Sequence, residues 1–385
     1  MIIGERLKLA RRAAGLSLRE LAASAGISAQ AISKYERGLD TPSSGVLLRL
    51  AEALGVKIEY FFRRSKVNLS PPAYRKKSTL PRKKEGAVLA RIQEWLERYL
   101  EVEELFSPGE AACRFIFPED VNPSVAAPEE AERVAEELRA AWQTGLDPIE
   151  NLTELLEDKG IKVGLVEGAK GFGACTFTTE EGCPVIAVRR DLPGDRQRFN
   201  LAHELGHIIL RSGKGVSVEK AAHRFAGAFL VPAPAACREL GERRHALSLY
   251  ELHLLKHKYG LSMQAWIYRA KDLGIISEAL ARNLFREFRR RGWCEKEPGD
   301  QLPPEDLELQ SGVVWHAVGE PGPNAGFVLA TRSAADGQDR CLVEVFNGSR
   351  QPHATRLEIL AGTNLLQQQA LGLTPTQRVS LRFMI

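Results

Sequence analysis

The run L-A-H-E-L-G-H-I-I-L at residues 201–210 constrains the fold of this chain more than any other stretch. It lacks proline and is apolar except for His203, Glu204 and His207, which predicts a buried helix. Residues four apart share one helix face, so His203 and His207 can direct two imidazoles at one metal ion. Glu204 then lies close enough to take a proton from a water beside that metal. The alternative is a buried helix with two hydrogen-bonded histidines.

A metal site of this kind needs a third ligand. The H-E-x-x-H spacing is typical of zinc peptidases, in which a catalytic zinc keeps three protein ligands and one open position. Residues 219–232, E-K-A-A-H-R-F-A-G-A-F-L-V-P, predict a second helix that ends at Pro232. Glu219 at its start is the predicted third ligand, an arrangement known as the gluzincin plan. Zn²⁺ is the expected cofactor, and Mn²⁺ or Fe²⁺ can occupy the same donor set.

His223 lies one turn after Glu219 and is predicted to orient a ligand histidine without binding the metal itself. Direct ligation and an ordinary place on the helix surface are the alternatives for His223. Peptide hydrolysis also needs a donor for the oxyanion. Four side chains nearby in the sequence are candidates, and the sequence does not choose among them: His245, Tyr250, His253 and His257.

Charge is distributed unevenly along the chain. Residues 1–85 contain 18 Lys and Arg against 7 Asp and Glu, a net charge of +11. Since the whole chain carries +4, the other 300 residues carry −7. A basic N-terminal part on an acidic body predicts that the N-terminal part binds a polyanion.

Residues 1–63 are predicted to form an all-α domain of five short helices. Ser17 can cap the second helix, with Glu20 at the capping-box position. Gly26 then gives a sharp turn and Ser28 caps the third helix. Two short helices joined by such a turn form a helix-turn-helix, whose second helix enters the major groove of DNA.

The stretch L-S-L-R-E-L-A-A-S-A-G-I-S-A-Q-A-I-S-K-Y-E-R-G, residues 16–38, resembles the phage-repressor-type (XRE) family of helix-turn-helix regulators. The resemblance implies a double-stranded DNA operator and a homodimer. It also implies six DNA-binding residues: Ser28, Ala29, Gln30, Ser33, Lys34 and Arg37. Gln30 can pair with adenine, Lys34 can reach guanine or phosphate, and Arg37 suits a phosphate. The alternative is a small helical module that binds proteins.

The next two segments connect the domains. Residues 63–85 combine three prolines with nine Lys and Arg, so 64–85 are predicted to be an extended basic linker that attracts phosphates or serves as a solvated tether. Residues 86–127 begin with an amphipathic connecting helix. This helix is expected to pack on the body, the alternative being pairing with its copy in a dimer.

Residues 128–299 are predicted to form the body that carries the metal helix. The expected elements are helices at 128–144 and 148–158, strands at 161–166 and 184–188, and the metal helix at 195–211. This order is typical of an α+β, zincin-like domain. Residues 300–385 contain β-like runs at 313–318, 326–331 and 341–346, which predict a small β-rich region of unknown role. The fold class is therefore multidomain.

The body resembles the ImmA/IrrE family of metallopeptidases over about residues 130–297. The resemblance is carried mainly by R-Q-R-F-N-L-A-H-E-L-G-H at 196–207 and by the block at 219–232. It implies that His203, His207 and Glu219 are metal ligands and that Glu204 is the general base. It further implies a cytoplasmic regulator that cleaves or controls a helix-turn-helix repressor in a stress, mobile-element or toxin–antitoxin circuit.

The remaining features agree with a cytoplasmic protein. The six cysteines include no C-x-x-C pair and are expected to be free thiols in a reducing compartment. The N-terminus lacks the apolar core of a signal peptide, and no membrane association is expected. The leading hypothesis is a DNA-binding transcriptional regulator with a peptidase that cleaves a repressor-type or partner protein. The alternative is a repressor or antitoxin whose peptidase fold is a non-catalytic sensor or dimerisation scaffold.

Overall fold

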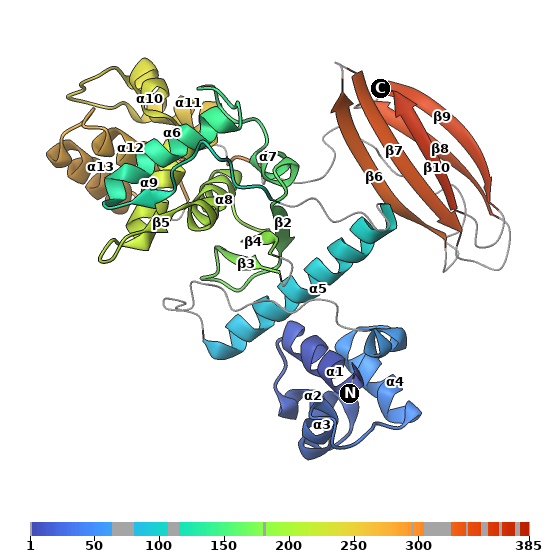
Figure 1. The fold of residues 1–385 in the computed structure, drawn as a ribbon. Helices are drawn as coiled ribbons and strands as arrows, with labels where there is room; N and C mark the ends of the chain where they lie inside the picture. Colours follow the sequence, from blue (N-terminus) through green and yellow to red (C-terminus); the bar gives the residue numbers. More distant parts are fainter. Residues whose placement is uncertain are drawn as a thin grey trace. The chain divides into compact units, whose positions relative to one another are not determined.

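A computed structural model of the chain describes residues 2–63, 81–106, 115–179, 182–294, 296–299 and 301–303, together with five strands between residues 325 and 384. The chain divides into two compact units, Met1–Glu305 and Asp306–Ile385 (Figure 1). Among the helices that the structure describes, none is both long and apolar enough to span a membrane.

The N-terminal helices form a domain with its own core. They are α1 (Ile2–Ala13), α2 (Leu18–Ala25), α3 (Ala29–Glu36), α4 (Ser44–Leu54) and a final 3-10 turn, η1 (Ile58–Phe62). Ser17 and Glu20 form the expected capping box on α2, and the Ser28 side chain caps α3. Gly26 takes φ 63° at the turn between these helices, a conformation that favours glycine. The predicted helix-turn-helix arrangement is confirmed, and the fifth helix is this 3-10 turn.

The connecting helix α5 (Arg82–Phe106) starts earlier than the sequence predicts. Residues 82–85, assigned to the linker, form its first turn, because Lys, Arg and Glu are good helix formers and Pro81 stands just before the helix. The rest of the predicted linker, 64–80, lies outside the described residues.

One side of α5 contacts the helix-turn-helix domain. Arg6 on α1 forms a buried ion pair with Glu97 of α5, and its Nε also donates to the Arg63 carbonyl oxygen at 2.9 Å. The Tyr60 hydroxyl donates to Glu94 Oε1 at 2.5 Å. Since breaking a buried ion pair by removing one partner is strongly destabilising, these contacts favour the observed packing of the domain on α5.

The other side of α5 covers a three-stranded sheet. The strands are β2 (Lys162–Val166), β3 (Ala174–Thr178) and β4 (Pro184–Arg189), in the order β2-β4-β3. β2 runs parallel to β4, while β3 runs antiparallel to it and forms an edge. The strands at 161–166 and 184–188 agree with the sequence prediction, whereas β3 was not predicted.

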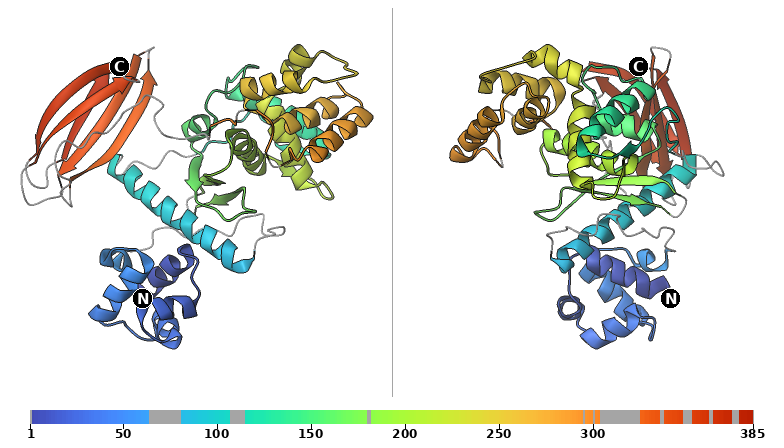
Figure 2. Two further views of the ribbon diagram at one scale, coloured as in Figure 1. Left: turned by 180° about the vertical axis from the view of Figure 1, so that it is seen from behind. Right: turned by 60° about the vertical axis from the view of Figure 1, so that its left-hand side comes forward.

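Alternate residues of β4 contribute to two different cores. Val185 and Ala187 pack with the α5 side chains Ile92 and Leu96. Ile186, by contrast, faces the larger core that contains the metal helix. The views in Figures 1 and 2 show this layering, with α5 on one face of the sheet and α8 on the other. The prediction that the connecting helix packs on the body is confirmed.

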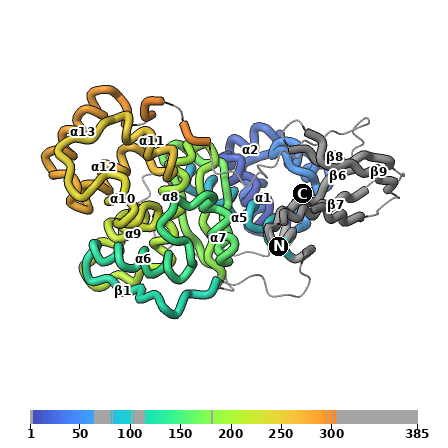
Figure 3. The backbone as a smooth tube through the Cα atoms, turned by 90° about the horizontal axis from the view of Figure 1, so that it is seen from above, coloured from blue at the N-terminus to red at the C-terminus, as the bar shows by residue number. Residues whose placement is uncertain are grey.

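The body is otherwise helical, with two short strands. Its helices are η2 (Pro128–Glu130), α6 (Ala131–Ala141), α7 (Leu152–Asp158), α8 (Gly194–Ile209), α9 (Val218–Leu230), α10 (Ala233–Leu240), α11 (Leu249–Tyr259), α12 (Met263–Asp272) and α13 (Glu278–Arg290). β1 (Ser124–Val125) pairs in parallel with β5 (Arg211–Ser212). Figure 3 shows α11, α12 and α13 grouped side by side. The α+β arrangement expected from the sequence is confirmed.

Three predicted helices are longer than the observed ones. The helix expected at 128–144 ends at Ala141, and Gln143 takes φ 57° in the turn that follows. The helix expected at 148–158 starts only at Leu152, because the Asn151 side chain caps it. The metal helix ends at Ile209, since Arg211 is drawn into pairing with β1.

The C-terminal unit contains the strands β6 (Ala325–Ala335), β7 (Gln338–Asn347), β8 (His353–Ala361), β9 (Asn364–Leu373) and β10 (Arg378–Met384). They pair antiparallel, in the order β10-β7-β6 and as the pair β8-β9. The β-like runs at 326–331 and 341–346 lie within β6 and β7. The run at 313–318 lies outside the described residues.

A buried carboxyl beneath α5 leads to a pH prediction. Burial raises the pKa of Glu157 on α7 to about 7, although the neighbouring Lys162 and Tyr99 oppose this shift. A carboxyl whose pKa is higher in the folded than in the unfolded protein stabilises the fold most at low pH, and this contribution is lost as pH rises through the folded pKa. We expect the free energy of unfolding to fall by roughly 1–3 kcal/mol between about pH 4.5 and 7. Urea titrations at a series of pH values measure it.

The same titrations on Glu157→Gln isolate the contribution of this carboxyl, because the amide cannot titrate. The exposed Glu154→Gln on the same helix is the control and should keep the wild-type pH dependence. Wild type and Glu157→Gln with parallel curves would contradict the assignment.

Candidate metal centre

Helices α8 and α9 approach each other closely enough to share a site. A Cβ built on Gly206 would lie 3.2 Å from the Cα of Ala222, so a side chain at position 206 would require α9 to shift by a few tenths of an ångström. Gly206 stands immediately before His207, so this close approach of the two helices lies next to a predicted ligand. The Ser217 side chain caps α9 and places Glu219 in its first turn.

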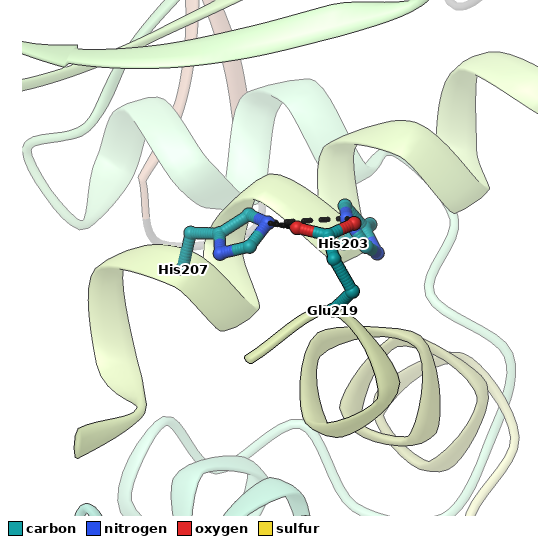
Figure 4. A group of neighbouring side chains, drawn as sticks. All are labelled: His203, His207 and Glu219. Atoms are coloured by element: carbon teal, nitrogen blue, oxygen red, sulfur yellow. Dashed lines mark hydrogen bonds and ion pairs between the residues drawn. The ribbon is translucent and has the colours of Figure 1, made fainter. Parts of the chain in front are cut away.

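The structure brings the three predicted ligands together. The Nε2 atoms of His203 and His207 lie 3.1 Å apart. Glu219 Oε2 lies 3.6 Å from His203 Nε2, and Glu219 Oε1 lies 3.4 Å from His207 Nε2. Figure 4 shows both imidazoles and the carboxylate pointing toward one another, the histidines from α8 and the glutamate from α9. Within the described part of the chain, these residues form a group that could hold a metal ion.

The distances fit one tetrahedral ion. Ligand atoms about 2.0–2.1 Å from a zinc ion and separated by a tetrahedral angle lie roughly 3.4 Å from one another. The two imidazole nitrogens lie 3.1 Å apart, and each lies close to this value, at 3.6 and 3.4 Å, from a different oxygen of the Glu219 carboxylate. Glu219 Oε1 is buried and accepts no hydrogen bond, which is costly for a carboxylate unless a cation completes the site. The residues present therefore fit a divalent metal.

The histidines are held in the form that binds metals. Burial, with help from the neighbouring His223 and His207, lowers the pKa of His203 to about 3. Burial also lowers the pKa of His207, although the Glu219 carboxylate acts in the opposite direction. Neutral imidazole is the ligand form of histidine, so both rings are ready to bind at neutral pH.

Glu204 lies on the sheet side of α8. Its Oε2 accepts a hydrogen bond from the Thr176 hydroxyl of β3 at 2.6 Å. Burial raises the pKa of Glu204 to about 7, while this hydrogen bond acts to lower it. A carboxylate with a pKa close to neutral is suited to exchanging protons with a substrate. Sequence reasoning missed Thr176, because β3 itself was not predicted.

His223 contacts the site through its ring. Its centroid lies 4.4 Å from that of His203, and it stacks on Phe199 with the centroids 5.7 Å apart. The Nδ1 atom of His203 is buried without a hydrogen-bond partner, so the contact is one of packing. His223 is also outside the group of three that could hold the metal. Its predicted role in orienting a ligand therefore stays a prediction, with ring packing as the observed contact.

The candidate oxyanion donors lie on or before α11. Tyr250 is 72% exposed. His245 and His257 are exposed, and the ring of His253 lies 4.6 Å from that of His257. No described contact links these four side chains to the metal group, and the donor stays unassigned.

The predicted DNA-binding residues share one side of the helix-turn-helix domain. Gln30, Lys34 and Arg37 are exposed, while Ile32 on the opposite side of α3 is fully buried. Ala29 and Ser33 are half-buried. Since residues three, four and seven apart share a helix face, the polar side chains form a continuous surface suited to a groove of DNA.

Comparison with protein families finds matches for two stretches of the chain. Residues 7–61 match the model described as Helix-turn-helix, and residues 156–271 match the IrrE N-terminal-like domain, a peptidase family. The chain thus joins an XRE-type helix-turn-helix domain to an IrrE/ImmA-like domain, as the two resemblances in its sequence predict.

The similar curated proteins each match 60 residues of the chain and are named as transcriptional regulators. The chain is 43% identical over 60 residues to a protein of Rhodospirillum rubrum named as a transcriptional regulator in the ATPase CF(0) region; the match covers 16% of this chain and 56% of that protein. It is 40% identical over 60 residues to an HTH-type transcriptional regulator of Rickettsia prowazekii, covering 16% and 46% of the two chains. The chain spans about half the length of the curated relatives it matches. No solved structure matches the chain.

Removal of the carboxylate ligand tests the metal centre. In Glu219→Gln, we expect zinc affinity to fall by at least about 100-fold. Mutation of a residue that only orients a metal ligand costs up to about 100-fold in affinity, and loss of a ligand should cost no less. Competition against a chromophoric chelator measures this affinity, and circular dichroism checks the fold. The exposed Glu242→Gln is the control and should bind zinc as wild type does. Wild-type affinity in Glu219→Gln would remove Glu219 from the ligand set.

Proposed function

We propose that this chain, which joins a helix-turn-helix domain to an IrrE N-terminal-like domain, is a cytoplasmic transcriptional regulator with a metal-dependent peptidase. The observation that carries the proposal is the group of His203, His207 and Glu219, together with Glu204, whose pKa is raised by burial and in part by the Glu219 carboxylate. This group lies in the same compact unit as an exposed DNA-binding surface on α3. The preferred metal is Zn²⁺, for which two imidazoles and one carboxylate are a common donor set, and Mn²⁺ or Fe²⁺ could replace it.

The reaction we propose is peptide hydrolysis. His203, His207 and Glu219 would hold the metal, which when bound would activate water and polarise the scissile carbonyl. Glu204 accepts a proton from the attacking water and delivers it to the leaving amine. Its burial, which raises its pKa to about 7, suits both steps near neutral pH.

The sheet offers a binding surface for an extended peptide. β3 pairs with β4 on one side and is one of the two edge strands of its sheet. An edge strand can bind a peptide by adding it as a further strand. Thr176 of β3 touches Glu204, so a peptide bound along this edge would pass close to the proposed base. We therefore favour a protein substrate with an accessible extended segment, such as a helix-turn-helix repressor or a toxin.

The helix-turn-helix domain is proposed to bind an operator as a homodimer. Gln30 would read adenine, Lys34 guanine or phosphate, and Arg37 phosphate. Ser28, Ala29 and Ser33 complete the surface at the start and middle of α3. Two half-sites read by two copies would follow the usual symmetry of such domains. The free thiols at Cys175, Cys183, Cys237 and Cys294 agree with a reducing compartment.

One observation favours a second candidate function, a sensor that does not cleave. Arg6 and Tyr60 of the helix-turn-helix domain bind α5, and α5 shares a core with the sheet of the body. A change in the body would therefore reach the DNA-binding domain through one rigid helix. In this alternative the protein is a repressor or antitoxin, and the metal site serves sensing or dimerisation.

The base variant separates the two functions. We expect the metal-loaded wild type to cleave a repressor or toxin encoded beside its gene. The cleavage rate of Glu204→Gln should be at least about 100-fold lower, since the amide cannot accept the proton. Gel electrophoresis and mass spectrometry of the products measure cleavage. Glu242→Gln is again the control. Cleavage that persists in Glu204→Gln would overturn the mechanism, and absence of cleavage by wild type with intact DNA binding would favour the sensor.

The base-reading role of Gln30 is tested on DNA. A duplex selected with wild-type protein from a random pool should bind Gln30→Ala about 5- to 100-fold more weakly, the cost of losing one bidentate base contact. Fluorescence anisotropy measures both affinities. A non-specific duplex is the matched control and should bind both proteins equally, because phosphate contacts remain. Equal affinity of both proteins for the selected duplex would exclude this contact.

A further inference from the structure

The edge strand β3 contacts the metal helix through one hydroxyl group. Thr176 Oγ1 donates to Glu204 Oε2 at 2.6 Å and lies 3.4 Å from the backbone carbonyl oxygen of Glu204. Thr176 pairs in register with Ile186, which faces the core around α8. Because side chains alternate along a strand, the register directs the Thr176 hydroxyl at α8.

The neighbours of Thr176 hold β3 in place without this hydroxyl. Phe177 is buried in the core under α5, and Cys175 packs against the same core. β3 also keeps an unbroken antiparallel register with β4 from Ala174 to Thr178. The strand is therefore fixed by packing and by backbone hydrogen bonds. The contact to Glu204 is an addition to that framework.

A glutamate on a helix has several rotatable bonds, and its carboxylate can turn away from the position where it works. The Thr176 hydroxyl occupies one carboxylate oxygen, Oε2, which leaves the other oxygen to exchange a proton. A short charge-assisted hydrogen bond of this kind is strong enough to select one rotamer of the side chain. Glu204 is only 8% exposed, so little water competes for the same oxygen.

We propose that Thr176 is a positioning residue, which holds the Glu204 carboxylate in the orientation needed to serve a ligand bound at the metal. This inference rests on the proposed peptidase function and deepens it. Thr176 acts through Glu204 and does not bind the metal. The contact also couples the proposed peptide-binding edge to the base, since both belong to β3.

The test uses the full-length chain loaded with Co²⁺, whose visible absorption reports the ligands around it. The probe is acetohydroxamate, which chelates a metal through two oxygens and presents a group for hydrogen bonding to a neighbouring carboxylate. We expect Thr176→Val, which keeps shape and β-propensity, to bind acetohydroxamate about tenfold more weakly, the loss of one hydrogen bond to a charged group. The affinity for Co²⁺ should stay within about twofold of wild type, since no metal ligand changes.

Two further variants make the result specific. Thr176→Ser keeps the hydroxyl and should restore acetohydroxamate binding to within about twofold of wild type. Thr178→Val changes an exposed threonine of the same strand and should have no effect. If Thr176→Val does not fold, Thr176→Ala compared with Thr176→Ser answers the same question. Wild-type acetohydroxamate binding by the folded variant that lacks the hydroxyl would overturn the proposal, as would a failure of serine to restore it.

Glu204→Gln separates this proposal from the one on which it rests. If Glu204→Gln binds acetohydroxamate more weakly while Thr176→Val binds normally, Glu204 serves the metal ligand but Thr176 does not position it. If Glu204→Gln also binds as wild type does, Glu204 has no role at the metal and both proposals are wrong. With a cleaved substrate in hand, Thr176→Val should lower kcat about tenfold and leave KM unchanged, because the defect lies in the base and not in binding.

Discussion

The close packing of α8 on α9 is the contact on which the rest of the site depends. At Gly206 the two helices approach so closely that a Cβ would meet the backbone of Ala222. This approach lets Glu219 cross from one helix to the two histidines of the other. It also leaves the three side chains only partly exposed, and burial is the main cause of the lowered pKa of His203. The absence of a side chain at position 206 thus favours the close approach of the two helices that carry the predicted ligands.

The helix α5 connects the two domains by packing against both of them, as the contact of α8 with α9 joins the two halves of the metal site. Its Glu94 and Glu97 hold the helix-turn-helix domain, and its Ile92 and Leu96 close the core beneath the sheet. Trp95 lies directly over Gly164 of β2, where any side chain would collide with the indole ring. Polar contacts on one side and apolar contacts on the other make α5 a structural part of both domains.

Local signals in the sequence predicted much of this structure, and non-local contacts account for the rest. The capping box of Ser17 and Glu20 and the H-E-x-x-H helix depend on residues only a few positions apart, and the structure confirms both elements. β3 depends on pairing with β4 and on the core beneath α5, so its own five residues gave little sign of it. Because β3 was not predicted from the sequence, the contact of its Thr176 with Glu204 was not predicted either. The early end of α8 has the same origin, because Arg211 pairs with a strand almost ninety residues away.

The buried pair of Arg6 and Glu97 has a consequence for how such proteins diversify. A DNA-binding domain on a free tether can be exchanged for another with a different operator, since nothing else in the chain contacts it. Here the exchanged piece would need an arginine facing Glu97 and a hydroxyl facing Glu94 to keep the ion pair and the hydrogen bond with α5. The unit that can be exchanged between proteins is therefore the helix-turn-helix domain together with α5. A new operator specificity is more readily acquired by substitutions on the exposed face of α3 than by recombination between domains.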